Sequence, residues 1–306
     1  MQLISISEYP VKPVLDIILI DKTTKQNIVF ATNSYAHLGS RYQESCPIDA
    51  DLLFGKNALD IQPRVYKAIE EQADRTKKRA EVMTPAWIVN KMNNHCDEEW
   101  FGRPDIFNKE VDNTWEPNQS VIVFPEGRSW EQYVKSTRLE ITCGEAPYLV
   151  SRYDTTTGDV IPIGFRVGIL DRKLRVVGEN TKTREEYLKG TYEAFKSVYG
   201  YEFQGDNLLI ARINLLNTFV DYMSAMWDEL PSVKELKIVA NIIAWNIWQM
   251  DGLTGMVPFG FQEPTYQQLS LFDSSVSDEQ EPKEAIPARI YDWRANKSVK
   301  YNSIKE

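Results

Sequence analysis

Histidine and cysteine are scarce in this chain of 306 residues. The two histidines, His37 and His95, exclude a histidine-rich metal site and leave few candidates for imidazole acid–base chemistry. The three cysteines, Cys46, Cys96 and Cys143, are too widely spaced for a disulfide framework or a zinc site. We therefore expect a reduced, cytoplasmic protein that holds no metal.

Long apolar runs are also missing. The longest uncharged apolar stretch, around residues 238–250, is too short and too polar to cross a bilayer. The first residues show no basic region followed by an apolar one. We expect no membrane partner.

Positive charge is in deficit. The chain has 35 Lys and Arg residues against 44 Asp and Glu, a net charge of −9, which argues against a surface that coats a nucleic acid over its whole extent. Two local basic strips remain as candidates, although an ordinary solvated face explains each equally well. They are Arg75–Arg79 and the C-terminal segment with Arg289, Arg294, Lys297 and Lys300.

Hydrophobic patterning divides the chain into three regions. Residues 1–75 should form a β-rich and helical N-terminal region, residues 76–256 a core, and residues 257–306 an acidic linker with a C-terminal tail. Short apolar strands alternate with amphipathic helices in the core, which favours an α/β layer fold.

The expected elements follow from the same patterns. Strands are expected at residues 14–20, 121–124, 138–142 and 201–203. Helices are expected over residues 59–79, from Thr84-Pro85, over 183–198 with a capping box at Thr183 and Glu186 and a stop at Gly200, over 207–230, and from Pro231. Residues 95–118 should be a long connection and residues 267–287 a flexible linker.

A strand followed by a small-residue turn occupies residues 138–149. The segment Leu139-Glu140-Ile141-Thr142-Cys143-Gly144-Glu145-Ala146-Pro147-Tyr148-Leu149 predicts a strand, an acidic residue, a turn and the apolar start of a helix. Gly144 would let a ligand approach the backbone closely, and exposed amides of the turn could receive a carboxylate or a phosphate. The glycine patterns of dinucleotide-binding and phosphate-binding loops are both absent from the sequence. An ordinary strand–turn–helix unit is the alternative explanation.

With three further segments, this one resembles the cofactor motifs of DNA adenine N6-methyltransferases from restriction–modification systems, in the class whose cofactor motifs precede the catalytic motif. Leu139, Glu140, Cys143 and Leu149 match the strand-and-loop motif, and Ile141 replaces the usual proline. The resemblance implies S-adenosylmethionine as the cofactor. It also implies a methyltransferase-like (Rossmann-like) α/β core, flanked by the N-terminal extension and the C-terminal tail.

The resemblance further implies roles for residues outside that turn. Thr84 and Pro85 match the leading motif, which opens a helix beside the methionine end of the cofactor. Glu202 matches the acidic residue that accepts both ribose hydroxyls, and Phe203 would pack on the adenine. Asp251 lies where the third motif should receive the adenine amino group. Glu140, Cys143 and Gly144 complete the implied cofactor site.

The chain departs from the family at the catalytic loop, because no Asn/Asp/Ser-Pro-Pro-Tyr/Phe tetrapeptide occurs in it. The nearest string makes Glu263, Pro264 and Tyr266 weak catalytic candidates, and a plain turn is the alternative. Residues 290–297 resemble the segment that precedes the catalytic motif in larger relatives. We therefore expect DNA to be bound together with a second subunit that carries the catalytic and recognition parts or an endonuclease.

Other functions stay open at this point. The chain could be a non-catalytic binding or regulatory subunit that keeps the methyltransferase fold as a scaffold, or a methyltransferase acting on RNA or a small molecule. Asp16, Asp21 and Lys22 could belong to a nuclease site. Trp245 and Trp248 could stack on bases, although their spacing is also that of core residues.

Overall fold

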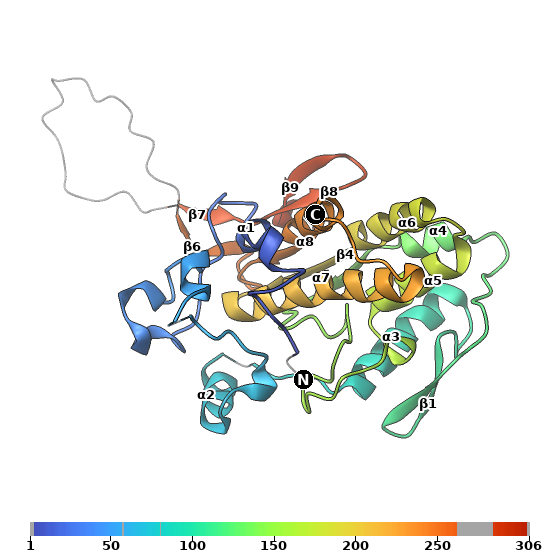
Figure 1. Ribbon diagram of the computed structural model, residues 1–306, viewed down its shortest axis with the longest axis horizontal. Coiled ribbons are helices and arrows are strands. Elements are labelled where there is room, and N and C mark those ends of the chain that lie inside the picture. Colours follow the sequence, from blue (N-terminus) through green and yellow to red (C-terminus); the bar gives the residue numbers. More distant parts are fainter. Residues whose placement is uncertain (1–2, 57, 80, 262–283, 305–306) are drawn as a thin grey trace, which may run out of the picture.

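The computed structural model describes residues 3–56, 58–79, 81–261 and 284–304. Its mixture of helices and strands confirms the expected α/β class (Figure 1). In these ranges, no helix has both the length and the apolar character needed to cross a lipid bilayer.

Three parallel strands form the centre of the fold. They are β3 (Arg138–Glu140), β4 (Val198–Glu202) and β5 (Ile247–Gln249), in the order β3-β4-β5. The expected strands at 138–142 and 201–203 are therefore present, with shifted ends. Strand β5 lies inside a stretch whose pattern reads as helical, because all three of its residues are buried and none alternates with solvent.

Two pairs of helices connect these strands. Helices α5 (Ile169–Asn180) and α6 (Arg184–Lys196) lead from β3 to β4, and α7 (Gly205–Trp227) and α8 (Val233–Asn246) lead from β4 to β5. The Thr183–Glu186 capping box is confirmed at the start of α6. Gly200 does not end this helix, since it lies inside β4, and α8 begins at Val233 because Ser232, not Pro231, caps it.

The two faces of the sheet belong to different hydrophobic clusters. Val198 and Ile247 point into the main core, which the helices build. Tyr201 of β4 and Trp248 of β5, on the opposite face of the sheet, point into a second cluster with Ile290. This second cluster joins the sheet to the C-terminal strands β6 (Met256–Phe261), β7 (Ala285–Pro287), β8 (Arg289–Asp292) and β9 (Lys297–Lys300).

The N-terminal segment packs against the main core. The expected strand at 14–20 is wrong: a 3-10 turn at Lys12–Val14 leads into helix α1 (Leu15–Leu19). Leu15, Ile18 and Leu19 share one helical face that contacts α7 and α8, so tertiary packing overrides the β-propensity of this run.

Buried Arg212 ties the same segment to the sheet. Its guanidinium donates hydrogen bonds to the carbonyls of Ile18, Ile20 and Ile247. Burial lowers the pKa of Arg212 to about 10, and the charge of Asp21 opposes this shift.

The segment from 59 to 134 differs most from expectation. Helix α2 covers only Ile69–Arg79 of the expected 59–79. Helix α3 (Ala86–Phe101) and the hairpin of β1 (Asn108–Val111) and β2 (Thr114–Pro117) fill most of the expected connection at 95–118. Residues 121–124 are not a strand, because the Ile122 N–H donates to the Glu179 carboxylate.

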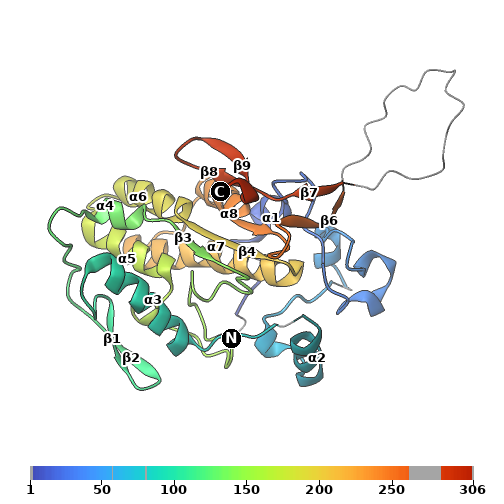
Figure 2. The same cartoon turned by 180° about the vertical axis from the view of Figure 1, so that it is seen from behind.

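The remaining elements are short. Helix α4 spans Trp130–Val134. Further 3-10 turns lie at Ala36–Leu38, Ser40–Tyr42, Ala50–Leu53, Arg64–Tyr66, Ile163–Phe165 and Tyr301–Ile304. Both views place α2 and the β1–β2 hairpin toward opposite ends of the molecule (Figures 1 and 2). Most of the expected linker at 267–287 lies outside the described residues, and its end forms β7.

Candidate functional site

The candidate site lies at the carboxyl ends of the parallel strands, where ligands bind in open α/β sheets. Each strand ends in a residue with a polar side chain: Glu140 on β3, Glu202 on β4 and Gln249 on β5. Gln249 is committed to the fold, because its amide exchanges hydrogen bonds with the backbone of Val29 at 2.9 and 2.8 Å. Glu140 and Glu202 instead hold the turn that follows β3.

Backbone amides of the turn donate to both carboxylates. The N–H groups of Tyr148 and Leu149 donate to Glu140 at 3.3 and 3.1 Å. The N–H of Gly144 donates to Glu202 at 2.9 Å, across 58 residues of sequence. The structure therefore brings together two of the segments that the sequence analysis singled out.

The turn carries unusual backbone geometry. Thr142, Gly144 and Ala146 all have positive φ, at 46°, 52° and 65°. Two of these are not glycine, and such strained residues concentrate at functional sites. The expected helix start at Pro147–Leu149 is wrong: these residues form a further turn, and α5 begins only at Ile169. The amides of Tyr148 and Leu149 donate to Glu140, so they do not form a helix N-terminus that is open to a ligand.

Both carboxyl groups are perturbed by burial. Burial raises the pKa of Glu140 to about 8, the two backbone donors oppose the rise, and the charge of Glu202 adds to it. Burial also raises the pKa of Glu202, again against two backbone donors, one of them the N–H of Gln204 at 3.0 Å. Two buried carboxyl groups with raised pKa values at adjacent strand ends are typical of a functional site.

A hydrogen-bonded network of charged and polar side chains adjoins Glu202. The Glu81 carboxylate accepts hydrogen bonds from Arg75 Nε at 2.8 Å, Gln204 at 3.0 Å and Asn207 at 2.9 Å. Arg75 also donates to Asp206 at 2.9 Å. We call these five residues the Glu81 network. It ties α2 and the residues before α3 to the N-terminus of α7.

Asp206 is the electrostatic centre of this network. Burial by itself raises the pKa of Asp206, but the positive charges of Lys67 and Arg75 outweigh it and hold the pKa well below its usual range. Lys67 Nζ lies 2.8 Å from the Asp206 carboxylate, and the Tyr35 hydroxyl donates to it at 2.9 Å. Arg75 is only 2% exposed, so the expected basic strip at 75–79 does not present this residue to solvent.

Met83 covers the turn itself. A Cβ placed on Gly144 would meet only the Met83 thioether, with its sulfur at 3.7 Å. Met83 follows Glu81 by two residues and is buried. The flexible side chain of Met83 thus occupies the space beside the Gly144 Cα, where a side chain would otherwise lie.

The start of α3 differs from the expected cap. Thr84 does not cap the helix: Pro85 is the N-cap residue, and the Ala86 N–H donates to Asp154 at 2.7 Å. The Thr84 carbonyl accepts a hydrogen bond from the Thr155 hydroxyl at 3.0 Å. Sequence reasoning missed Asp154, because it lies 68 residues away from the helix that it caps.

The other candidate residues have local roles. Cys143 is 2% exposed, and burial raises its pKa well above the usual range, which argues against a thiolate nucleophile. The Phe203 carbonyl accepts a hydrogen bond from Gln249 at 2.8 Å. Asp251 lies two residues beyond β5 and caps a turn by accepting the N–H of Leu253 at 2.8 Å. Glu263, Pro264 and Tyr266 lie outside the described residues.

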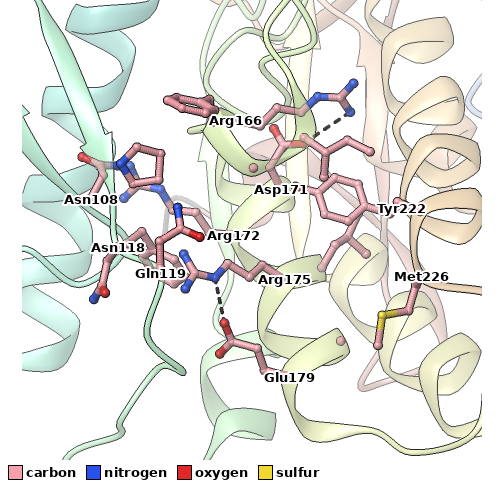
Figure 3. Close-up of a pocket in the computed structure, with 18 of the residues that line it drawn as sticks. Asn108, Asn118, Gln119, Arg166, Asp171, Arg172, Arg175, Glu179, Tyr222 and Met226 are labelled. Atoms are coloured by element: carbon pink, nitrogen blue, oxygen red, sulfur yellow. Dashed lines mark hydrogen bonds and ion pairs between the residues drawn. The ribbon is translucent and has the colours of Figure 1, made fainter.

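A separate cavity of about 410 Å³ lies between α5, α7 and the β1–β2 region (Figure 3). Its three arginines are paired: Arg166 with Asp221 at 2.7 Å, Arg172 with Asp97 at 2.5 Å and Arg175 with Glu179 at 2.7 Å. Because each arginine is paired with a carboxylate and no candidate residue lines the cavity, it does not compete with the site at the strand ends. Among the residues that the structure describes, no group of three or more His, Cys, Asp or Glu side chains could hold a metal ion.

Comparisons with protein-family models, with curated proteins and with solved structures found no match to this chain. The functional assignment therefore depends on the residues and geometry described above.

Proposed function

We propose that this chain is the S-adenosylmethionine-binding component of a DNA adenine methyltransferase, and that β3–β5 with their helices are the cofactor half of a methyltransferase-like fold. The observation that carries the proposal is the hydrogen bond from the Gly144 N–H to Glu202 at 2.9 Å. It joins two of the four segments to which the resemblance assigns the cofactor. The strand order β3-β4-β5 places them side by side at one edge of the sheet.

The residues at this edge fit the cofactor in their chemistry. A carboxylate offers about four lone-pair sites, and the backbone donors of Gly144 and Gln204 occupy only two of those on Glu202. The buried Gln204 Oε1 has no hydrogen-bond partner among the described residues and is a second acceptor beside Glu202. Met83 packs beside Gly144 and would have to shift for a ligand to take that space, and methionine is an adaptable, flexible side chain.

Each residue would then have a positioning role. Glu202 would accept the two ribose hydroxyls, Thr84 would donate its hydroxyl to the cofactor carboxylate, and Phe203 would pack on the adenine. Glu140 would hold the turn that presents Gly144. Asp251 would need to release its turn before it could receive the adenine amino group. The cofactor, when bound, supplies a methyl group on a sulfonium sulfur.

The proposal assigns adenine positioning to a second chain, because the catalytic tetrapeptide of the family is missing from this sequence. That partner would supply an Asn-Pro-Pro-Tyr loop and the recognition of the target sequence. Catalysis in such an enzyme depends on holding the two reactants in line.

Thermal unfolding with and without S-adenosylmethionine tests the proposal. A ligand at about 100 times its dissociation constant stabilises a protein by about 2.7 kcal/mol. For a chain of this length, that corresponds to a rise in Tm of roughly 5–10 °C. The rise should fall to about half or less in Glu202→Gln and persist in Glu126→Gln, which changes an exposed carboxylate. No rise in the wild-type chain at saturating cofactor contradicts the proposal.

A second candidate function is a non-catalytic scaffold, and the closed turn favours it. Both Glu202 oxygens already accept backbone hydrogen bonds, and Met83 covers Gly144. A scaffold would show no cofactor-dependent rise in Tm either in the wild-type chain or in Met83→Ala. If Met83 merely gates the site, Met83→Ala should bind the cofactor at least as tightly as the wild type.

A further inference from the structure

A groove of about 710 Å³ crosses the sheet face that the helices leave free. One wall is the sheet, with Leu139 on β3 and Tyr199 on β4. The other wall is the β8–β9 hairpin, with Tyr291, Trp293 and the turn between the strands. The hairpin stands beside α6 and α8 in both views (Figures 1 and 2).

The charge of the groove is opposite to that of the chain. Its lining includes Lys135, Lys196, Arg294 and Lys297 against Glu193 and Asp292, although the net charge of the protein is −9. Lys135 and Lys196 approach Glu193 at 3.8 and 2.8 Å. Arg294 and Lys297 are exposed at the hairpin turn. Two residues of the second basic strip, Arg294 and Lys297, thus lie on one wall of the groove.

Two aromatic rings on the hairpin wall lie between these charges. The Tyr291 and Trp293 rings lie 4.5 Å apart, and Lys196 Nζ lies 5.7 Å from the Trp293 ring centroid. Tyr199 donates its hydroxyl to the Tyr291 carbonyl at 3.1 Å, which fixes the hairpin to the sheet. Partly exposed rings held in place among cations are the arrangement with which proteins bind single-stranded nucleic acid.

The groove runs beside β3, the strand that ends in Glu140. Leu139, which lines it, is 45% exposed and immediately precedes Glu140. Ile141, the residue after β3, is 63% exposed. Because successive side chains of a strand point to opposite faces, Leu139 faces the groove and the buried Glu140 points away from it.

We propose that this groove binds an unpaired stretch of DNA, with Lys135, Lys196, Arg294 and Lys297 on the phosphates and the Tyr291–Trp293 pair stacked on bases. The choice of DNA over RNA depends on the proposed function, and the binding itself does not. A second protein chain is the alternative occupant, which the experiment distinguishes.

Fluorescence anisotropy with a labelled 12-nucleotide single strand and its matched duplex tests this assignment. Four phosphate contacts predict a slope of about −2.8 in log affinity against log salt, which is a loss of about 50-fold between 50 and 200 mM NaCl. The double variant Arg294→Ala, Lys297→Ala should reduce the slope by about 1.4. The matched control, Lys91→Ala with Lys109→Ala, removes two exposed lysines from α3 and β1 and should bind as the wild type does.

A third variant tests stacking separately from charge. Trp293→Leu should weaken binding by about 5- to 150-fold and leave the salt slope unchanged. Tighter binding of the single strand than of the duplex supports the proposal, and tighter binding of DNA than of RNA of the same sequence supports the choice of DNA.

Three results overturn the proposal. The first is that the wild-type chain binds neither oligonucleotide at 50 mM NaCl. The second is that the Arg294→Ala, Lys297→Ala variant binds DNA as tightly as the control variant does. The third is that the Arg294→Ala, Lys297→Ala variant binds DNA normally but sediments as a monomer where the wild type sediments as a dimer. That result would assign the groove to a second copy of the chain. The Tm response to S-adenosylmethionine, measured on the same variants, does not depend on any of these three results. It therefore distinguishes a failure of the groove proposal from a failure of the proposed function.

Discussion

Replacing Glu140 by glutamine should make the stability of the protein less dependent on pH. Glu140 is buried at the end of β3, and burial raises its pKa from 4.5 to about 8. Glutamine keeps the size of the side chain and one oxygen for the amides of Tyr148 and Leu149, but it does not titrate.

The expected magnitude follows from linkage between protonation and folding. Below pH 4.5 both the folded and the unfolded chain hold the proton, and Glu140 adds no pH dependence. Between pH 4.5 and about 8 the unfolded chain loses the proton and the folded chain keeps it, so the free energy of unfolding falls as pH rises. The interval of about 3.5 pH units, at 1.36 kcal/mol each, sets an upper bound of about 5 kcal/mol.

Urea unfolding of the wild-type chain and Glu140→Gln at pH 5, 6, 7 and 8 measures this effect. The variant should gain stability relative to the wild type at each step, and the difference should level off above pH 8. Glu126→Gln, at an exposed carboxyl, is the control for general effects of pH. A difference between wild type and Glu140→Gln that stays constant from pH 5 to 8 would refute the account of a buried, protonated Glu140.

Two further substitutions test the packing around the site. Gly205→Ala should lower the free energy of unfolding by about 3 kcal/mol or more, because its Cβ would lie 2.0 Å from the Val29 carbonyl oxygen. Gly164→Ala, whose Cβ enters open space, is the control, and the urea midpoints of the two variants are compared. Arg75→Ala should cost about 3–5 kcal/mol, because it removes the partner of two buried carboxylates, and Lys77→Ala on the exposed face of α2 should change stability by less than about 0.5 kcal/mol. Equal unfolding free energies for Arg75→Ala and Lys77→Ala would contradict the structural role of the Glu81 network.

The sequence pattern predicts helices α6 and α7, whose signals lie within the helices themselves. The capping box at Thr183 marks α6, and the amphipathic repeat of residues 207–230 marks α7, because both depend on neighbouring residues. Tertiary contacts decide the rest. The run at 14–20 has the composition of a strand, yet its apolar face packs on α7 and α8 as a helix.

The candidate site was predictable only in part. Glu140 and Gly144 stand out in sequence, because a strand end and a small-residue turn are local signals, whereas Glu202 is singled out only by the resemblance to the methyltransferase motifs. Met83 and Arg75 were not predictable as site residues, since their roles come from contacts between distant segments. In sequence Arg75 belongs to a charged run, which favours a solvated face, whereas two buried carboxylates hold it inside the protein.

Direct titration of S-adenosylmethionine into the folded chain, followed by calorimetry, tests the central claim. We predict one binding site per chain. In Glu202→Gln the affinity should be about 10- to 150-fold weaker, because hydrogen bonds to a charged group contribute about 1.5–3 kcal/mol. Equal affinity in both proteins would place the cofactor elsewhere, and the absence of binding by the wild-type chain at millimolar cofactor would contradict the assignment.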